Sequence, residues 1–403
     1  MTFLERRRER LADELARAAA DGWLVYDFRG SNPAFGRLLG PSLPQSTRRA
    51  FLYVPSREQG RGPRLLIHHV DAGNFARLGL EVRAYGGRDE LLDGLRELLG
   101  PARRVLMEYS PGNAIPYVGR VDAGTVEVVR SLGVDVVSSA DALASVVAAW
   151  DAADLASHER AARALERAKD ALFAALRSVL ALCQVWTEVD AQQHLVKVFA
   201  DEGLECDHPP IVAVNAHAGD PHYAPEPGLA LPIRHGDLVL VDLWAREAQR
   251  PDGGPGAYAD ITWMATASDT LPPDQLHVWQ TVRDARDAAV GFLSERLAAG
   301  QPTQGGEVDR AARQVIAAAG YGAAFSHRTG HSIGWTGAHG DGVNIDDFET
   351  HDTRLLRPGA AFSIEPGVYL PAFGMRSEIN VAITPGGQLK VTTPPQQEVV
   401  WLV

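Results

Sequence analysis

Up to about residue 148, short apolar runs alternate with segments whose apolar residues recur every three to four positions. The short runs are typical of buried strands, and the longer spacing is typical of amphipathic helices. The predicted strands are residues 23–26, 51–54, 65–67, 105–107 and 134–137, and the predicted helices are residues 89–99 and 124–132. This alternation predicts a small α/β domain.

After a hinge at residues 147–153, the pattern predicts a long amphipathic helix to about residue 180. A second helix begins at Thr187, whose hydroxyl is placed to cap the amide of Asp190. The remaining predicted elements are strands 211–214, 237–246 and 258–265, helices 274–298 and 306–319, and strands 361–364, 376–383 and 398–403. Two helices followed by strands occur twice, which predicts an α+β domain with an internal repeat of architecture. The expected domains are residues 1–148 and 149–403.

Composition narrows the class of protein. The chain has 403 residues, 45% hydrophobic and 22% charged, which is the balance of a soluble globular protein of two domains. A net charge of −12 argues against nucleic acid as the main partner. Two cysteines are too few for a disulfide framework, so a reducing compartment is expected. Without an apolar leader or a run of 18 apolar residues, the sequence predicts a cytoplasmic protein with no membrane partner.

Acidic residues occur where apolar ones are expected. Asp242 lies within residues 238–244, a run that is apolar on both faces and typical of a buried strand. Alone, it would be interpreted as an aspartate paired with an arginine or with backbone amides. Asp260, Glu365 and Glu378 border or occupy similar apolar runs. Four converging carboxylates repel one another unless divalent cations lie between them.

One histidine completes a candidate metal site. His331 lies between Gly330 and Gly334, which allow the backbone to approach a site closely. A single histidine in such a loop is more often a turn residue, and only the acids change that interpretation. Oxygen ligands with one imidazole suit Mn²⁺, and also Co²⁺, Fe²⁺ or Zn²⁺.

The order Asp, Asp, His, Glu, Glu in these contexts resembles the pita-bread metallopeptidase family, which includes methionine aminopeptidase, aminopeptidase P and prolidase. The matching segments are Val241-Asp242-Leu243, Asp260-Ile261-Thr262, Gly330-His331-Ser332-Ile333-Gly334, Ser363-Ile364-Glu365-Pro366-Gly367-Val368-Tyr369 and Arg376-Ser377-Glu378. The resemblance covers about residues 150–403 and implies the pita-bread fold there. The first domain resembles the N-terminal domain of the proline-specific and creatinase-like branches, which methionine aminopeptidases lack.

The resemblance also implies roles for the five residues. Asp260 and Glu378 would bridge two divalent metal ions, Asp242 would bind one of them, and His331 with Glu365 would bind the other. A hydroxide that bridges the metals would be the nucleophile, and Glu365 would relay its proton to the leaving nitrogen.

Three further histidines fit the substrate region of the family. His222 and His339 are expected to be catalytic, and His327 to bind substrate, by hydrogen bonds to the substrate carbonyl and the developing oxyanion. The histidines interpreted as surface or packing residues are His208, His217, His235, His277 and His351.

The residues expected to bind the substrate carboxylate differ from those of prolidases. Prolidases have an arginine before the first Glu motif, and His351 occupies the aligned position here, with Arg354 and Arg357 close by. Arg376 is a second candidate, as a carboxylate ligand or as a partner of the metal ligands. Residues 251–256 form an insertion, predicted to be a hairpin loop that leaves Asp242 and Asp260 on their strands. The loop at residues 335–338 is one residue longer than in most relatives.

The resemblance therefore implies a homodimeric Xaa-Pro peptidase that acts on short proline-containing peptides. A dipeptidase is the leading interpretation, and aminopeptidase P, acting on Xaa-Pro-Yaa peptides, is the alternative. A creatinase-like C–N hydrolase and a non-catalytic pita-bread binding module would both be expected to have lost metal ligands, and all five are present.

Overall fold

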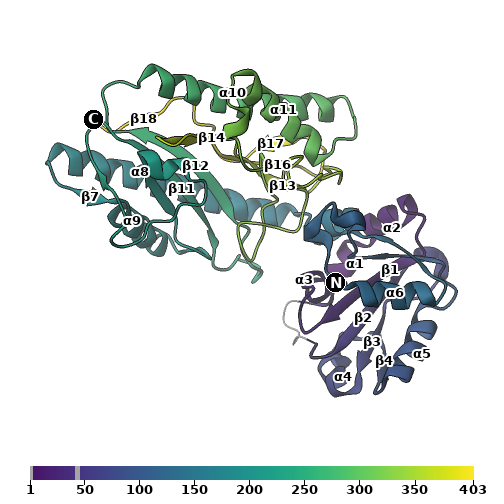
Figure 1. Ribbon diagram of the computed structural model, residues 1–403. Coiled ribbons are helices and arrows are strands. Elements are labelled where there is room, and N and C mark those ends of the chain that lie inside the picture. Colours follow the sequence, from purple (N-terminus) through teal and green to yellow (C-terminus); the bar gives the residue numbers. More distant parts are fainter. Residues whose placement is uncertain (1–2, 41–45) are drawn as a thin grey trace. The chain divides into compact units, whose positions relative to one another are not determined.

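The computed structural model describes residues 3–40 and 46–403. Contacts divide the chain into two compact units, Met1–Ala148 and Ala149–Val403. We call them the N-terminal unit and the C-terminal unit and describe each by itself (Figure 1). Within the described ranges, no helix combines the length and the apolar character needed to cross a membrane.

The N-terminal unit is a six-stranded mixed sheet in the order β4-β3-β2-β1-β5-β6. Its strands are β1 Gly22–Phe28, β2 Arg49–Pro55, β3 Arg64–His68, β4 Glu81–Tyr85, β5 Arg104–Met107 and β6 Asp135–Ser138. Its helices are α1 Phe3–Arg6, α2 Arg8–Arg17, α3 Pro33–Leu39, α4 His69–Phe75, α5 Arg88–Leu99, α6 Ala123–Ser131 and α7 Ala140–Ala142. The predicted α/β architecture is confirmed. Strand β4 was missed because it lies at the sheet edge and only Tyr85 of it is fully buried, so it has no apolar run.

Four long helices cover the strands of the C-terminal unit, with α8 and α9 on one side and α10 and α11 on the other (Figure 1). They are α8 Ala152–Ala181, α9 Glu188–Asp201, α10 Pro273–Ala298 and α11 Gly305–Ala318. The predicted cap of α9 is confirmed, because the Thr187 hydroxyl accepts from the Asp190 amide at 3.2 Å.

The strands of the C-terminal unit repeat one arrangement. They are β7 Trp186–Thr187, β8 Leu204–Glu205, β9 Ile211–Val214, β10 Pro232–Ile233, β11 Leu238–Glu247, β12 Ala259–Thr266, β13 Ala361–Ile364, β14 Gly367–Tyr369, β15 Gly374–Arg376, β16 Ile379–Ile383, β17 Leu389–Val391 and β18 Val400–Trp401. In the first half α8 and α9 precede the antiparallel pair β11–β12, and in the second half α10 and α11 precede the antiparallel pair β13–β16. The expected repeat of architecture is present.

The strand predicted at residues 376–383 is not continuous. Residues 376–383 form the end of β15 and all of β16, with Ser377 and Glu378 between them. The strand is interrupted because β15 pairs with β14 while β16 pairs with β13. Glu378 therefore lies in a break, and Glu365 lies just beyond β13, rather than inside strands. The last predicted strand is also shorter, since β18 spans only Val400–Trp401.

Candidate metal centre

The first two acids come from one face of the β11–β12 ladder. Asp242 lies opposite Thr262, and Asp260 lies opposite Trp244. Because side chains alternate between the faces of a sheet, Asp242, Thr262 and Asp260 point to the same side. The inserted residues 251–256 lie between the two strands, so both acids remain on their strands as predicted.

The histidine loop is held against β13. Ser363 donates its amide to the carbonyl oxygen of His331, and its hydroxyl accepts from the amide of His331, both at 2.9 Å. The amide of Glu365 donates to the Thr329 carbonyl oxygen at 2.7 Å. A Cβ on Gly330 would overlap the carbonyl oxygen of Ser363, so only glycine allows this approach. The loop therefore delivers His331 beside Glu365.

The structure brings the five predicted ligands together in a cluster in which Glu365 is partly exposed and the other four are buried. Asp260, His331 and Glu378 each offer one ligand atom, and these atoms lie within 4.8 Å of one another. Nε2 of His331 is 3.5 Å from Asp260 Oδ2 and 3.5 Å from Glu365 Oε1. Asp242 joins through the Thr262 hydroxyl, which lies 3.0 Å from Asp242 Oδ1 and 2.8 Å from Glu378 Oε2.

The cluster is electrostatically unfavourable when it contains protein groups alone. Burial raises the pKa of Asp242 and raises that of Asp260 to about 7. Burial, with the charges of Asp260 and Glu365, raises the pKa of Glu378 well above its usual range. For Glu365 burial also acts upward, but His331 and other nearby cations outweigh it and lower the pKa. These shifts show how strongly the site disfavours four negative charges.

The residues fit divalent metal ions. Oε1 of Glu378 is buried and has no hydrogen-bond partner among the described residues, which is costly for a carboxylate oxygen. A cation at this position would supply the missing interaction and offset the repulsion among the acids. Carboxylates with one imidazole are the donors that divalent cations such as Mn²⁺ accept.

Arg376 belongs to the acid cluster. Its guanidinium contacts the carboxylate of Asp242 and donates from Nε to the Thr262 hydroxyl at 2.9 Å. Nη1 lies 3.4 Å from the hydroxyl of Tyr369. The residue is 6% exposed. Of the two roles considered for Arg376, these contacts favour a partner of the metal ligands.

His327 is engaged by protein groups at both ring nitrogens. Nδ1 lies 2.6 Å from the carbonyl oxygen of Arg328, and Nε2 lies 2.7 Å from the hydroxyl of Tyr369. Since a carbonyl only accepts, Nδ1 carries the proton and Nε2 accepts from Tyr369. Burial lowers the pKa of His327, which favours this neutral form. Tyr369 thus links His327 to Arg376, a connection that the sequence did not reveal.

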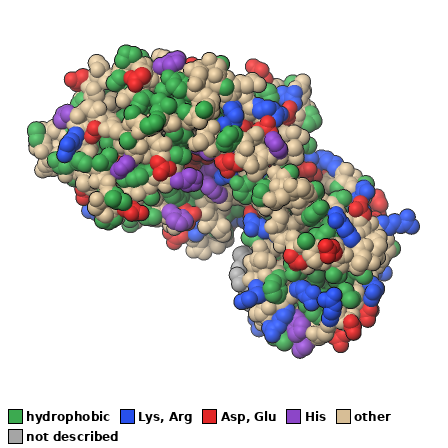
Figure 2. Space-filling view, viewed as in Figure 1, with side chains coloured by type: hydrophobic (Ala, Val, Ile, Leu, Met, Phe, Trp, Pro, Cys, Tyr) green, Lys and Arg blue, Asp and Glu red, His purple; other side chains and the backbone are tan. Residues whose placement is uncertain are grey.

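The two expected catalytic histidines are near the cluster. The ring of His339 lies 4.0 Å from that of His331, measured between centroids. The charge of His331, with burial, lowers the pKa of His339 to about 3, and His222 acts in the same direction. His222 is exposed, which leaves it open to a ligand. Figure 2 shows histidine side chains gathered beside acidic ones on a face of the C-terminal unit.

His351 is bonded to a different acid. It is exposed, and its Nδ1 lies 2.7 Å from a carboxylate oxygen of Asp347. Asp347 also pairs with Arg310 at 2.6 Å. Its acidic partner, Asp347, is not one of the predicted metal ligands.

Three supporting residues were missed by sequence reasoning. They are Thr262, Asn380 and Ser363. The side-chain oxygen of Asn380 accepts from the amide of Asp260 at 2.8 Å, and the Ser363 hydroxyl donates to Glu365 at 3.0 Å. Each is a buried polar residue in or beside an apolar strand, which is the signal that could have identified them.

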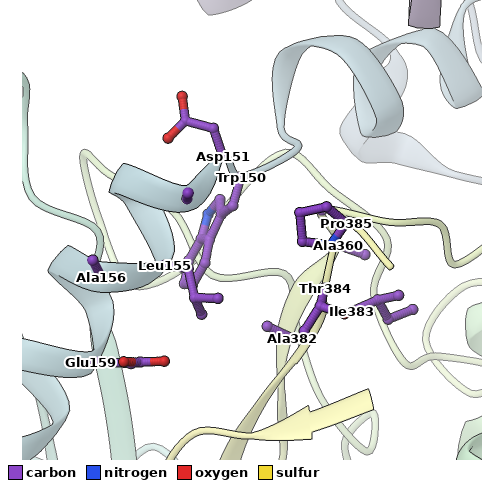
Figure 3. A pocket seen from close by; sticks show the side chains of 12 residues that line it. Trp150, Asp151, Leu155, Ala156, Glu159, Ala360, Ala382, Ile383, Thr384 and Pro385 are labelled. Carbon is purple, nitrogen blue, oxygen red and sulfur yellow. The ribbon is translucent and has the colours of Figure 1, made fainter. Parts of the chain in front are cut away.

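A separate hollow in the C-terminal unit does not coincide with the acid cluster. Figure 3 shows this cavity of about 200 Å³, with Trp150 and Leu155 on one side and Ala382 and Pro385 on the other. Its lining is mainly apolar, and none of the predicted site residues belongs to it. The candidate chemistry therefore lies at the acid cluster.

The chain is similar in sequence to known peptidases. The chain matches "Probable dipeptidase PepE" of Mycobacterium tuberculosis with 32% identity over 216 residues, 53% of this chain and 52% of that protein. It matches "Xaa-Pro dipeptidase" of Lactobacillus helveticus with 30% identity over 219 residues, 53% of this chain and 52% of that protein. The matched part thus spans about half the length of these curated relatives.

Solved structures resemble the chain over nearly its whole length. The crystal structure of dipeptidase PepE from Mycobacterium ulcerans has a TM-score of 0.73 and 24% identity, covering 99% of this chain and 97% of that chain. The prolidase from Pyrococcus horikoshii has a TM-score of 0.63 and 20% identity, covering 98% and 100%. The expected pita-bread fold with its N-terminal α/β domain is confirmed. A model of metallopeptidase family M24 matches residues 156–385. The chain therefore belongs to metallopeptidase family M24.

Proposed function

We propose that this protein is an Xaa-Pro dipeptidase that uses two divalent metal ions, with Mn²⁺ as the preferred metal. The observation that supports metal-dependent hydrolysis is the cluster of four carboxylates and His331, in which one oxygen of Glu378 has no hydrogen-bond partner among the described residues. The proline preference is supported by the Xaa-Pro dipeptidase of Lactobacillus helveticus among the relatives. A homodimer that acts on short proline-containing peptides is part of the same proposal.

Each residue has a role in the proposal. Asp242, Asp260, His331, Glu365 and Glu378 would hold the two ions. When bound, the ions would supply an acidified water as the nucleophile and would polarise the scissile carbonyl. Glu365 accepts a proton at its carboxylate and delivers it to the leaving nitrogen.

The histidines bind and orient the peptide. His222 is exposed, and its ring donates to the substrate carbonyl oxygen. His339, whose ring lies 4.0 Å from that of His331 between centroids, donates a ring N–H to the developing oxyanion. His327 acts through Tyr369 rather than by direct contact, since both of its ring nitrogens are engaged.

An Xaa-Pro aminopeptidase is the second candidate. A dipeptidase needs a cation for the free carboxylate of its substrate, and the guanidinium of Arg376 is already bound to Asp242. His351, the other expected carboxylate ligand, lies on an exposed loop beside Asp347. A tripeptide places its carboxylate farther from the scissile bond and does not need these groups.

A peptidase assay tests the proposal. The full chain loaded with Mn²⁺, and separately with Co²⁺, is offered an Xaa-Pro dipeptide, an Xaa-Pro-Yaa tripeptide and a dipeptide without proline. We expect the Xaa-Pro dipeptide to be cleaved fastest. Preference for the tripeptide would assign the chain to the aminopeptidase P type. Absence of cleavage of either proline peptide by metal-loaded protein would refute the proposal.

A matched control separates this activity from a contaminating peptidase. Glu378→Gln, purified in the same way, keeps the size of the side chain and removes the charge at the unpartnered oxygen. It should show no metal-dependent cleavage. Cleavage at the wild-type rate would mean that the assayed activity does not come from this site.

A further inference from the structure

The carboxylate of Glu188, the first residue of α9, is fully buried and accepts hydrogen bonds from four groups. Oε1 accepts from the amide of Val214 and Oε2 from the amide of Leu231, each at 2.7 Å. The hydroxyl of Tyr223 donates to Oε2 at 2.5 Å, and Nδ1 of His217 lies 2.9 Å from the same oxygen. Because a carboxylate only accepts, Nδ1 of His217 carries the proton.

These donors are the two ends and the interior of one segment, residues 214–231, which we call the His222 loop. Val214 ends strand β9, Leu231 precedes β10, and Tyr223 directly follows His222. The rings of His217 and Tyr223 stack with centroids 4.3 Å apart. The carboxylate of Glu188 therefore bonds to both ends and the middle of the loop. His222 itself is held locally, by a hydrogen bond from its amide to the Asp220 carboxylate at 2.9 Å.

The same loop packs against the β-hairpin that connects two predicted metal ligands along the chain. Strands β14 and β15 form that hairpin, which separates Glu365 from Glu378. A Cβ on Gly374 in β15 would overlap the carbonyl oxygen of Ala218, and a Cβ on Gly219 would overlap that of Leu370. The His222 loop is thus held between the carboxylate of Glu188 on one side and the backbone of the hairpin on the other.

We propose that Glu188 is a positioning residue that sets the place of His222 relative to the metal cluster. The proposal rests on the proposed function, in which His222 contacts the substrate. A small displacement of a group that contacts substrate can reduce the rate by about 100-fold. An exposed histidine on an irregular loop has few contacts of its own, so its position depends on what holds the loop.

Both side-chain terminal atoms of residue 188 must accept a hydrogen bond from a backbone amide. In Glu188→Gln, the amide NH₂ would face either the amide of Val214 or the amide of Leu231. Two donors cannot bond to each other, so one buried backbone N–H loses its partner in either orientation. Tyr223→Phe removes a single donor from the loop and leaves both backbone bonds in place.

The test compares both variants with His222→Ala in the Mn²⁺-loaded full chain. We expect kcat/KM for an Xaa-Pro dipeptide to fall about 10- to 100-fold in Glu188→Gln and less in Tyr223→Phe, with unchanged metal content. We expect Glu188→Gln combined with His222→Ala to be no slower than His222→Ala alone, because both changes remove the same contact. Independent, multiplying losses would overturn the proposal.

Thr187→Ala is the control for a purely structural effect. Thr187 caps the same helix end but bonds to Asp190 and not to the His222 loop. Loss of this cap destabilises α9 by about 1 kcal/mol and should leave kcat/KM unchanged. A loss of kcat/KM in Thr187→Ala equal to that in Glu188→Gln would show that weakening α9 is sufficient and would overturn the proposal.

Hydrogen exchange provides a readout that does not depend on activity. Amides in residues 214–231 should exchange faster in Glu188→Gln and Tyr223→Phe, while strands β11 and β12 keep their protection. Unchanged exchange in this segment would overturn the inference about Glu188. If the wild-type protein cleaves no proline peptide but the loop does loosen, the failure lies with the proposed function and not with Glu188 as the residue that holds the loop.

Discussion

Gly330 lies so close to Ser363 that a Cβ at position 330 would overlap the carbonyl oxygen of Ser363. This approach places His331 beside the acids, because its backbone forms two hydrogen bonds with Ser363. The carbonyl of His331 accepts from the amide of Ser363, and the amide of His331 donates to the hydroxyl of Ser363. Gly330→Ala should displace the loop, reduce the metal bound per chain and lower the free energy of unfolding by about 1–3 kcal/mol. Metal analysis and urea unfolding measure the two effects.

Gly291→Ala is the matched control for that change. Gly291 lies in α10 with no atom within 4 Å of an added Cβ. Alanine should stabilise the helix there by about 0.5–1 kcal/mol. Wild-type metal content in Gly330→Ala would contradict the importance of this contact.

The Thr262 hydroxyl joins the two halves of the cluster. It contacts Asp242 at 3.0 Å and Glu378 at 2.8 Å, and it accepts from Arg376. Thr262→Val should weaken metal binding about 10- to 100-fold and leave the fold intact, since groups that orient metal ligands contribute on this scale. Isothermal titration with Mn²⁺ measures the change, and Thr266→Val on the same strand is the control. Equal affinities for the two variants would argue against this role.

Glu378 should make the metal-free protein less stable. Burial and neighbouring acids raise its pKa well above the usual 4.5, so the folded apoprotein retains a proton that the unfolded chain releases. Stability of the apoprotein is therefore lost as pH rises above about 4.5. At pH 8, Glu378→Gln should bind less metal, yet its apoprotein should unfold at a higher temperature than the wild-type apoprotein. The expected gain in free energy of unfolding is about 1.4 kcal/mol for each unit by which folding raises the pKa of Glu378.

Calorimetry of the metal-free proteins checks this expectation. Glu295→Gln, at an exposed position of α10, should change neither metal content nor apoprotein stability. A lower melting temperature for metal-free Glu378→Gln than for wild-type apoprotein would show that Glu378 is not under electrostatic stress.

His158 predicts acid sensitivity of the C-terminal unit. Its ring is fully buried, with Nδ1 2.7 Å from the carbonyl oxygen of Tyr258, and burial lowers its pKa from 6.5 to about 4. The unfolded chain then binds more protons between these values, so stability is complete above pH 6.5 and is lost as pH falls toward 4. From pH 7.5 to 4.5 the loss from this group is about 2–3 kcal/mol.

Urea unfolding at the two pH values, in wild type and in His158→Gln, measures this contribution. The variant should lose less stability on acidification, whatever its stability at pH 7.5. His277→Gln, at an exposed position of α10, controls for the loss of a titratable histidine. The assignment is wrong if wild type and His158→Gln lose equal stability on acidification.

The sequence by itself determined the elements and the chemistry of the candidate site. Apolar runs predicted most strands because buried strands must exclude polar side chains, and the acids in those runs stood out for the same reason. Asp242, Asp260, His331, Glu365 and Glu378 could be named together because each interrupts an apolar or glycine-rich pattern. Strand β4 was missed because an exposed edge strand needs no such pattern.

Tertiary structure alone decided which groups around the cluster are free and which are engaged. Arg376 contacts Asp242, and His327 is bonded at both nitrogens, because strands and loops distant in sequence meet there. Spacing along the chain also failed to show that His351 is bonded to Asp347, or that Glu188 accepts hydrogen bonds from the loop of His222. Local patterns report burial and backbone geometry, whereas the partner of a buried polar group depends on contacts between segments that only the folded chain brings together.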